Sequence, residues 1–136
     1  MFERKGSTVD EPRRPVEEEE PVKADEKKIL SGIVRILEDG KALDPVVLDL
    51  RQLTSMTDYF AIAHGTNTRQ VQALARDLQE ALREEFQLRP HHVEGLSHGQ
   101  WILLDYGSFI VHLMLEDRRQ FYSLERIWMD APRVTP

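Results

Sequence analysis

Cysteine is absent from the 136 residues of the chain. A protein without cysteine has no disulfide framework, no thiolate zinc site, no iron–sulfur cluster and no cysteine nucleophile. The sequence also lacks any apolar run approaching the roughly 18 residues of a membrane-spanning helix. Its N-terminus has neither the apolar core of a signal peptide nor the acid-poor composition of a mitochondrial transit peptide. These absences favour a protein of the reducing bacterial cytoplasm.

Positive charge is in deficit, with 18 basic against 24 acidic side chains and a formal net charge of −6. This balance argues against a protein that gains its affinity by neutralising many nucleic-acid phosphates, although a local basic patch is compatible with it. The deficit is divided equally along the chain. Residues 1–25 hold five basic and eight acidic side chains, and residues 26–136 hold 13 and 16.

The first 25 residues differ in composition from the rest. They contain three of the seven prolines and four consecutive glutamates at 17–20. Such a segment cannot bury enough apolar surface to offset the loss of backbone entropy on folding. We therefore expect a disordered acidic tail over residues 1–25 and one folded domain over residues 26–136. A charged arm that contacts a partner is the functional alternative for the tail.

The hydrophobic pattern of the domain predicts eight elements in the order α-β-β-α-β-β-β-α. Helices are expected at 25–39, after the turn at 65–68, and from Asp117 towards Ala131; strands are expected at 46–50, 59–63, 92–94, 101–104 and 109–115. The short link between the first two strands favours antiparallel pairing, and the unit over 59–94 favours a right-handed parallel crossover. The fold class is therefore α/β, a single domain with one mixed five-stranded sheet and flanking helices.

The hairpin at 101–115 has two chemically different faces. Pairing Asp105 with Ser108, and Trp101 with His112, puts apolar residues alone on one face. That face comprises Ile102, Leu104, Phe109, Val111 and Leu113; the other comprises Trp101, Leu103, Asp105, Ile110, His112 and Met114. Tryptophan, methionine and histidine beside apolar residues are typical of a protein-binding patch. A second core layer under a helix is the alternative.

Several polar clusters suggest chemistry, but each also has a structural explanation. Asp49, Asp58 and Asp105 could bind magnesium for nucleotidyl transfer, yet the chain has no acid pair separated by one residue after position 70. Strand ends and turns explain these aspartates better. Three histidines near Gly95 (His91, His92 and His98) are better explained as surface residues than as a metal site. The turn before the second helix could bind an anion, but ordinary capping by Thr66 or Thr68 is preferred.

Six motifs together resemble one known family. They are Thr57–Phe60, Gly65–Thr66 with Arg69–Val71, Glu94–Gly95, Trp101–Gly107, Val111–His112 and Phe121–Trp128. In order and spacing, these motifs over roughly residues 26–132 are similar to those of the ribosomal silencing factor (RsfS) family, also called Iojap-like proteins. The sequence departs from that family at His64, where a small or thiol residue is common.

The resemblance implies a nucleotidyltransferase-like topology without known enzymatic activity. Members bind the large ribosomal subunit, chiefly its L-fourteen family protein, block association with the small subunit, and so repress translation when nutrients are limiting. Carried onto this chain, and combined with the mixed hairpin face, the resemblance implies the following partner-binding residues: Trp101, Leu103, Asp105, Tyr106, His112, Met114, Tyr122 and Trp128. No cofactor or metal is expected. Exposed apolar area on the hairpin would also allow a homodimer of the free protein.

Two functions of other classes stay open at this point. One is a magnesium-dependent nucleotidyltransferase-type enzyme, and the other is an RNA-binding module. An enzyme would bind magnesium nucleotides and turn them over, whereas an RNA-binding module would bind naked ribosomal RNA with a steep salt dependence.

Overall fold

The computed structural model describes residues 22–122, 126 and 128–136, with the backbone alone for residues 121 and 122. Nearly all of the expected acidic tail therefore lies outside the described residues. The expected order of eight elements is confirmed. The elements are α1 (Ala24–Asp39), β1 (Leu43–Asp49), β2 (Tyr59–Gly65), α2 (Thr68–Phe86), β3 (His92–Glu94), β4 (Trp101–Asp105), β5 (Phe109–Leu115) and α3 (Glu116–Tyr122).

One mixed sheet joins the five strands in the order β1-β2-β5-β4-β3. The antiparallel pairing of β1 with β2 is confirmed, and β5 runs parallel to β2. β2 and β3 run parallel, as the predicted crossover requires. β2 is parallel to β5, and both β5 and β3 are antiparallel to β4. β2 and β3 are not neighbours, however. The β4–β5 hairpin lies between them, which the local sequence pattern does not reveal.

The register of that hairpin differs from the prediction. Asp105 pairs with Ile110 instead of Ser108, and Trp101 pairs with Met114 instead of His112. The turn therefore centres on Gly107 and Ser108, and Gly107 has φ +89°. Glycine reaches this conformation without the steric cost that a tyrosine would incur in the predicted turn. The slip of two positions leaves every side chain on its predicted face, because the side-chain period of a strand is two.

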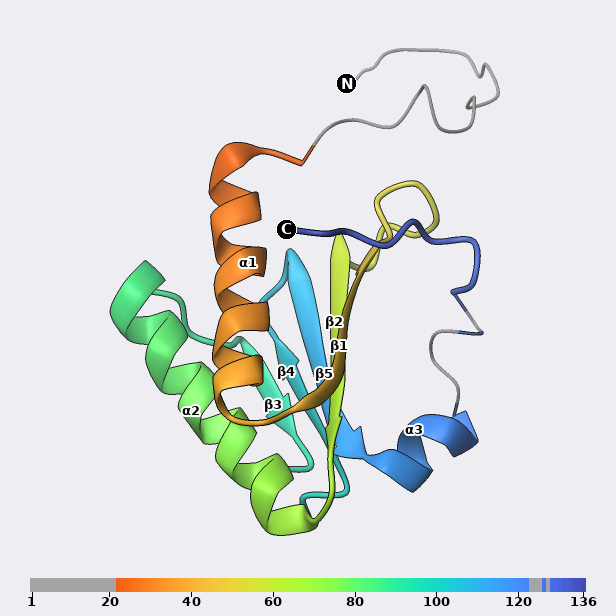
Figure 1. Ribbon diagram of the computed structural model, residues 1–136. Helices are drawn as coiled ribbons and strands as arrows, with labels where there is room; N and C mark the ends of the chain where they lie inside the picture. The colour runs from red at the N-terminus through yellow and green to blue at the C-terminus, as the bar shows by residue number, and fades with distance from the viewer. Residues whose placement is uncertain (1–21, 123–125, 127) are drawn as a thin grey trace, which may run out of the picture.

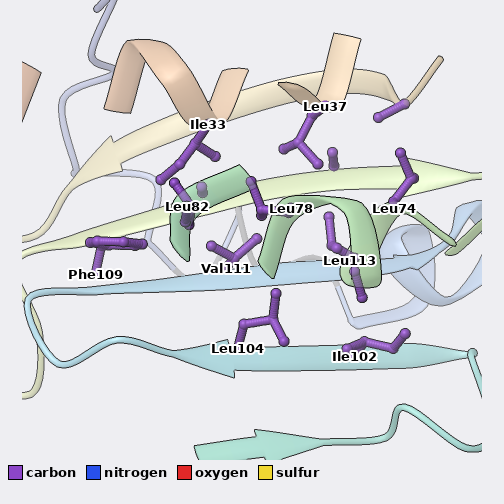
Figure 2. Close-up of a cluster of buried hydrophobic side chains, with 14 of the residues drawn as sticks. Ile33, Leu37, Leu74, Leu78, Leu82, Ile102, Leu104, Phe109, Val111 and Leu113 are labelled. Atoms are coloured by element: carbon purple, nitrogen blue, oxygen red, sulfur yellow. The ribbon is translucent and has the colours of Figure 1, made fainter. Parts of the chain in front are cut away.

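Two helices cover one face of the sheet, as Figure 1 shows. The leucines of α2 recur at intervals of four residues and point at the sheet in Figure 2; they are Leu74, Leu78 and Leu82. They meet Ile33 and Leu37 of α1 and the apolar face of the hairpin. Each fully buried leucine contributes about 2 kcal/mol of apolar burial, so this layer is the main source of stability.

A second, smaller apolar cluster lies on the opposite face of the sheet. Its buried members are Leu48, Leu50, Phe60, Ile62, Ile110, Met114 and Ala131. Trp128, in the turn after α3, packs edge-on against Phe60 with ring centroids 5.9 Å apart. The alternative of a second core layer therefore holds for the buried part of this face, and the protein-binding patch stays a prediction for its partly exposed part.

The C-terminal residues close the outer edge of β1. The amide of Val134 donates to the carbonyl of Val47, and the amide of Asp49 donates to the carbonyl of Pro132, each at 2.8 Å. Leu48 and Arg133 form an antiparallel bridge between these two hydrogen bonds. In the view of Figure 1 this segment crosses the upper ends of the strands and ends beside α1.

The cap of α2 differs from the expected threonine. Asn67 is the N-cap residue, and its side-chain oxygen accepts from the amide of Gln70 at 2.8 Å. The side chain of Gln70 in turn accepts from the amide of Thr66 at 2.8 Å. These reciprocal bonds satisfy two of the amides that an anion at this turn would use.

Candidate functional site

The candidate site is the face of the β4–β5 hairpin that the two long helices do not cover. We call it the mixed face, and it comprises Trp101, Leu103, Asp105, Ile110, His112 and Met114. Cross-strand pairing confirms that these six side chains share one face. The three residues of β5 are buried, whereas the three residues of β4 are partly exposed. The surface of the mixed face is therefore a row along β4, with the buried side chains of β5 beside it.

Trp101 begins this row, and a hydrogen bond holds its indole ring. Its Nε1–H donates to Nδ1 of His112 at 3.1 Å, and the two ring centroids lie 5.9 Å apart. His112 is 5% exposed, and burial lowers its pKa to about 4. The imidazole is therefore neutral at physiological pH.

Asp105 ends the row and has both a structural and a free oxygen. Its Oδ1 accepts from the amide of Gly107 at 2.8 Å and so fixes the hairpin turn. The other oxygen has no hydrogen-bond partner among the described residues, and the side chain is partly exposed. A cationic group of a partner could reach this oxygen without breaking the turn.

The other predicted site residues lie outside the exposed row along β4. Tyr106 lies on the helix-covered face, where it is 7% exposed and stacks on Phe109 at a centroid distance of 4.7 Å. Its hydroxyl has no hydrogen-bond partner in the described structure, and burial raises its pKa to about 12. Met114 is fully buried, and Trp128 is partly exposed. Tyr122 ends α3, and its side chain lies outside the described residues.

A buried arginine near this face was not anticipated from the sequence. Arg119 of α3 is 8% exposed, and its Nη1 donates to the carbonyl of Asp44 at 2.8 Å and lies 2.9 Å from Nδ1 of His64. It lines a pocket of about 590 Å³ together with Arg126 and Arg133. The contact gives His64, whose role the sequence left open, a place in anchoring α3 to the sheet. No local sequence pattern could predict the burial of Arg119, because the carbonyls that it binds belong to an irregular segment of β1.

The structure separates the aspartates that were considered as a magnesium site. Asp49 accepts from Nε and Nη2 of Arg51 at 3.0 and 2.7 Å. It pairs with Tyr59 and therefore lies on the helix-covered face, whereas Asp105 lies on the mixed face. Within the described ranges, no three histidine, aspartate or glutamate side chains are arranged to hold a metal ion. In the same ranges, no helix is long and apolar enough to cross a membrane.

Comparisons with known proteins identify the family. A family model described as "Ribosomal silencing factor during starvation" matches residues 23–136. The chain is 36% identical to the ribosomal silencing factor RsfS of Bacillus subtilis over 107 residues, which cover 79% of this chain and 90% of that protein. It is 33% identical over 98 residues to the mouse protein named mitochondrial assembly of ribosomal large subunit protein 1, covering 71% of this chain and 43% of that protein.

A solved structure agrees with the sequence comparisons. The crystal structure of a Chromobacterium violaceum protein superposes with a TM-score of 0.72 at 36% sequence identity, covering 76% of this chain and 85% of that chain. The five-stranded α/β architecture is therefore one that solved relatives share. The chain belongs to the ribosomal silencing factor family.

Proposed function

We propose that this protein represses translation by binding the large ribosomal subunit at its L-fourteen family protein and preventing association with the small subunit under nutrient limitation. Membership of a family named for ribosome silencing during starvation supports this proposal. The mouse relative, named for assembly of the large ribosomal subunit, supports the choice of subunit. The observation that carries the proposal is the partly exposed row of Trp101, Leu103 and Asp105 along β4.

The mechanism we propose is steric occlusion in the bacterial cytoplasm. A domain seated on the surface where the subunits meet excludes the other subunit by its volume, so the mechanism needs no bond-making step, metal or cofactor. In this view a nucleotidyltransferase-like topology serves only as a scaffold that displays one face of its sheet. The separation of Asp49 from Asp105 on opposite faces favours this function over magnesium-dependent nucleotidyl transfer.

The proposed contacts differ in kind along the row. Trp101 is the anchor, because a large aromatic side chain desolvated at the centre of an interface carries much of the binding free energy. Leu103 adds apolar area, and Asp105 offers a carboxylate to a basic ribosomal protein. Trp128, which is partly exposed, is proposed as part of the same surface, and the family resemblance adds Tyr122. His112 and Met114 are buried beside the row on the same face, and Tyr106 is buried on the helix-covered face, so any contribution of these three residues to binding is indirect.

Replacement of the anchor tests the proposal. Trp101→Ala should keep the fold and weaken co-sedimentation with purified large subunits by about 2 kcal/mol or more, which is roughly 30-fold. Arg76→Ala is the matched control, because Arg76 is exposed on α2, and α2 covers the other face of the sheet. A folded Trp101→Ala protein that binds large subunits like wild type would contradict the surface assignment. Salt-sensitive binding to naked ribosomal RNA would instead favour an RNA-binding module.

We also propose that the same face pairs two copies of the free protein. Trp101 and Leu103 are partly exposed apolar side chains. In this proposal the ribosome covers them in the complex, and a second copy of the chain covers them in the free protein. Sedimentation equilibrium over a concentration series tests this, and Trp101→Ala should shift the protein towards monomer. A wild-type protein that stays monomeric at all concentrations contradicts the pairing.

A further inference from the structure

His112 occupies a position that apolar packing alone would not assign to histidine. It lies in the middle of β5, on the mixed face, between Trp101 and Phe60. The Phe60 ring meets the imidazole edge-on, with centroids 4.6 Å apart and planes at 72°. The residue is 5% exposed, so its polar atoms must find partners within the protein.

One of the two imidazole nitrogens has a partner and the other does not. The indole Nε1–H of Trp101 can only donate, so Nδ1 of His112 must accept and carries no proton. The proton of the neutral ring is therefore on Nε2. Nε2 is buried and has no hydrogen-bond partner in the described structure. Burying this unpaired N–H destabilises the fold relative to an apolar side chain of similar size.

The position of His112 relative to Trp101 indicates the role of this histidine. Trp101 lies directly opposite Met114, and His112 is its diagonal neighbour across the hairpin. A hydrogen bond to a diagonal neighbour fixes the direction in which the long indole ring extends over the sheet. Trp101 is partly exposed, and this bond ties the polar edge of its ring to one buried acceptor, which favours one rotamer over the others.

We propose that His112 is a positioning residue for the docking face: its Nδ1 holds the Trp101 indole in the orientation that binds the ribosomal partner, without itself contacting that partner. The inference rests on the proposed function, because it concerns the same face. Its physical basis is pre-organisation, since an ordered anchor loses less rotamer entropy on binding than a free one.

Two substitutions separate this role from ordinary packing. His112→Asn places an amide oxygen at the position of Nδ1, whereas His112→Leu removes the acceptor and fills the site with apolar atoms. Leucine removes the orphan Nε2–H and should match or exceed the wild-type melting temperature, and asparagine should lower it by burying an unsatisfied amide. Affinity for large subunits should follow the opposite order. We expect a loss of about fivefold for His112→Leu and less than twofold for His112→Asn.

The indole N–H signal of Trp101 in ¹H–¹⁵N NMR gives a readout that needs no ribosome. The chain has two tryptophans, so a Trp128→Phe sample assigns the signal. Wild type and His112→Asn should show a hydrogen-bonded, exchange-protected indole, whereas His112→Leu should exchange about tenfold faster. An indole that is equally protected in His112→Leu would overturn the positioning role, as would affinity that falls in step with stability in both variants.

The two proposals fail in distinguishable ways. If Trp101→Ala binds large subunits like wild type, the docking face is wrong, and the NMR comparison still shows whether His112 orders the indole. If Trp101→Ala loses binding and His112→Leu does not, the docking face stands and the positioning role is wrong.

Discussion

Gly95 is the residue at which one added methyl group should do most damage to the docking face. It follows β3 directly and has φ +81°, in the region that side chains with a Cβ rarely adopt. A Cβ built there would lie 2.0 Å from the carbonyl oxygen of Trp101. That oxygen belongs to the backbone of β4, so no side chain can rotate away to relieve the overlap. Gly95→Ala therefore displaces the first residue of the exposed row.

The loss of stability in Gly95→Ala has two parts, and a second variant separates them. Positive φ alone costs an alanine about 1–2 kcal/mol, and backbone displacement of this kind adds about 1–3 kcal/mol. Gly107→Ala isolates the first part, because Gly107 has φ +89° but its Cβ would meet only the ring of His91, at 3.2 Å. Urea unfolding followed by far-ultraviolet circular dichroism measures both. We expect Gly95→Ala to be the less stable by at least 1 kcal/mol, roughly the lower end of the displacement cost. Equal losses of stability would refute the argument.

Other substitutions test the remaining parts of the structure. Leu78→Ala, at a fully buried position of α2, should lower the free energy of unfolding by about 2–5 kcal/mol in urea titrations. Asp49→Asn weakens the buried contact with Arg51 and should cost about 2 kcal/mol, whereas Glu85→Gln, which breaks an exposed pair of the same 2.7 Å length, should cost less than about 0.5 kcal/mol. The pKa of His112, about 4, lies below that of unfolded histidine, so stability is full above about pH 6.5 and falls as the pH drops towards 4. The difference in unfolding free energy between wild type and His112→Leu should therefore change by at most about 3 kcal/mol across that range, and a constant difference would contradict the assignment.

Elements and faces could be predicted from the sequence because they depend on local periodicity. The spacing of Leu74, Leu78 and Leu82 defines the buried stripe of α2 whatever it packs against. The two hairpin faces were predicted even though the register was wrong, because a slip of two residues preserves the alternation. The cap of α2 was assigned to threonine because Asn67 and its neighbours are similar in capping preference, and only the geometry of Gln70 decides among them.

Contacts between distant segments could not be predicted from local sequence patterns. The insertion of the hairpin between β2 and β3 depends on which strands pair, and adjacent residues do not encode it. The burial of His112 and Met114 depends on what covers them from elsewhere in the chain, so alternation put them on the right face without showing that they lie below its surface. Arg119 binds main-chain carbonyls, which every residue possesses, so its acceptors have no sequence signature.

The closure of the β1 edge by the C-terminal residues has a practical consequence for handling the protein. An unpaired strand edge is a template for intermolecular sheet formation. Deleting residues 131–136 would remove the bridge to Leu48 and the bond to Val47, and would leave β1 open to other molecules. The opposite edge, β3, is only three residues long and carries the exposed, hydrogen-bonded polar side chains of His92 and Glu94, which makes it a poor template. Aggregation of a shortened chain would therefore begin at β1, and expression tags are better added beyond Pro136 than in place of the last residues.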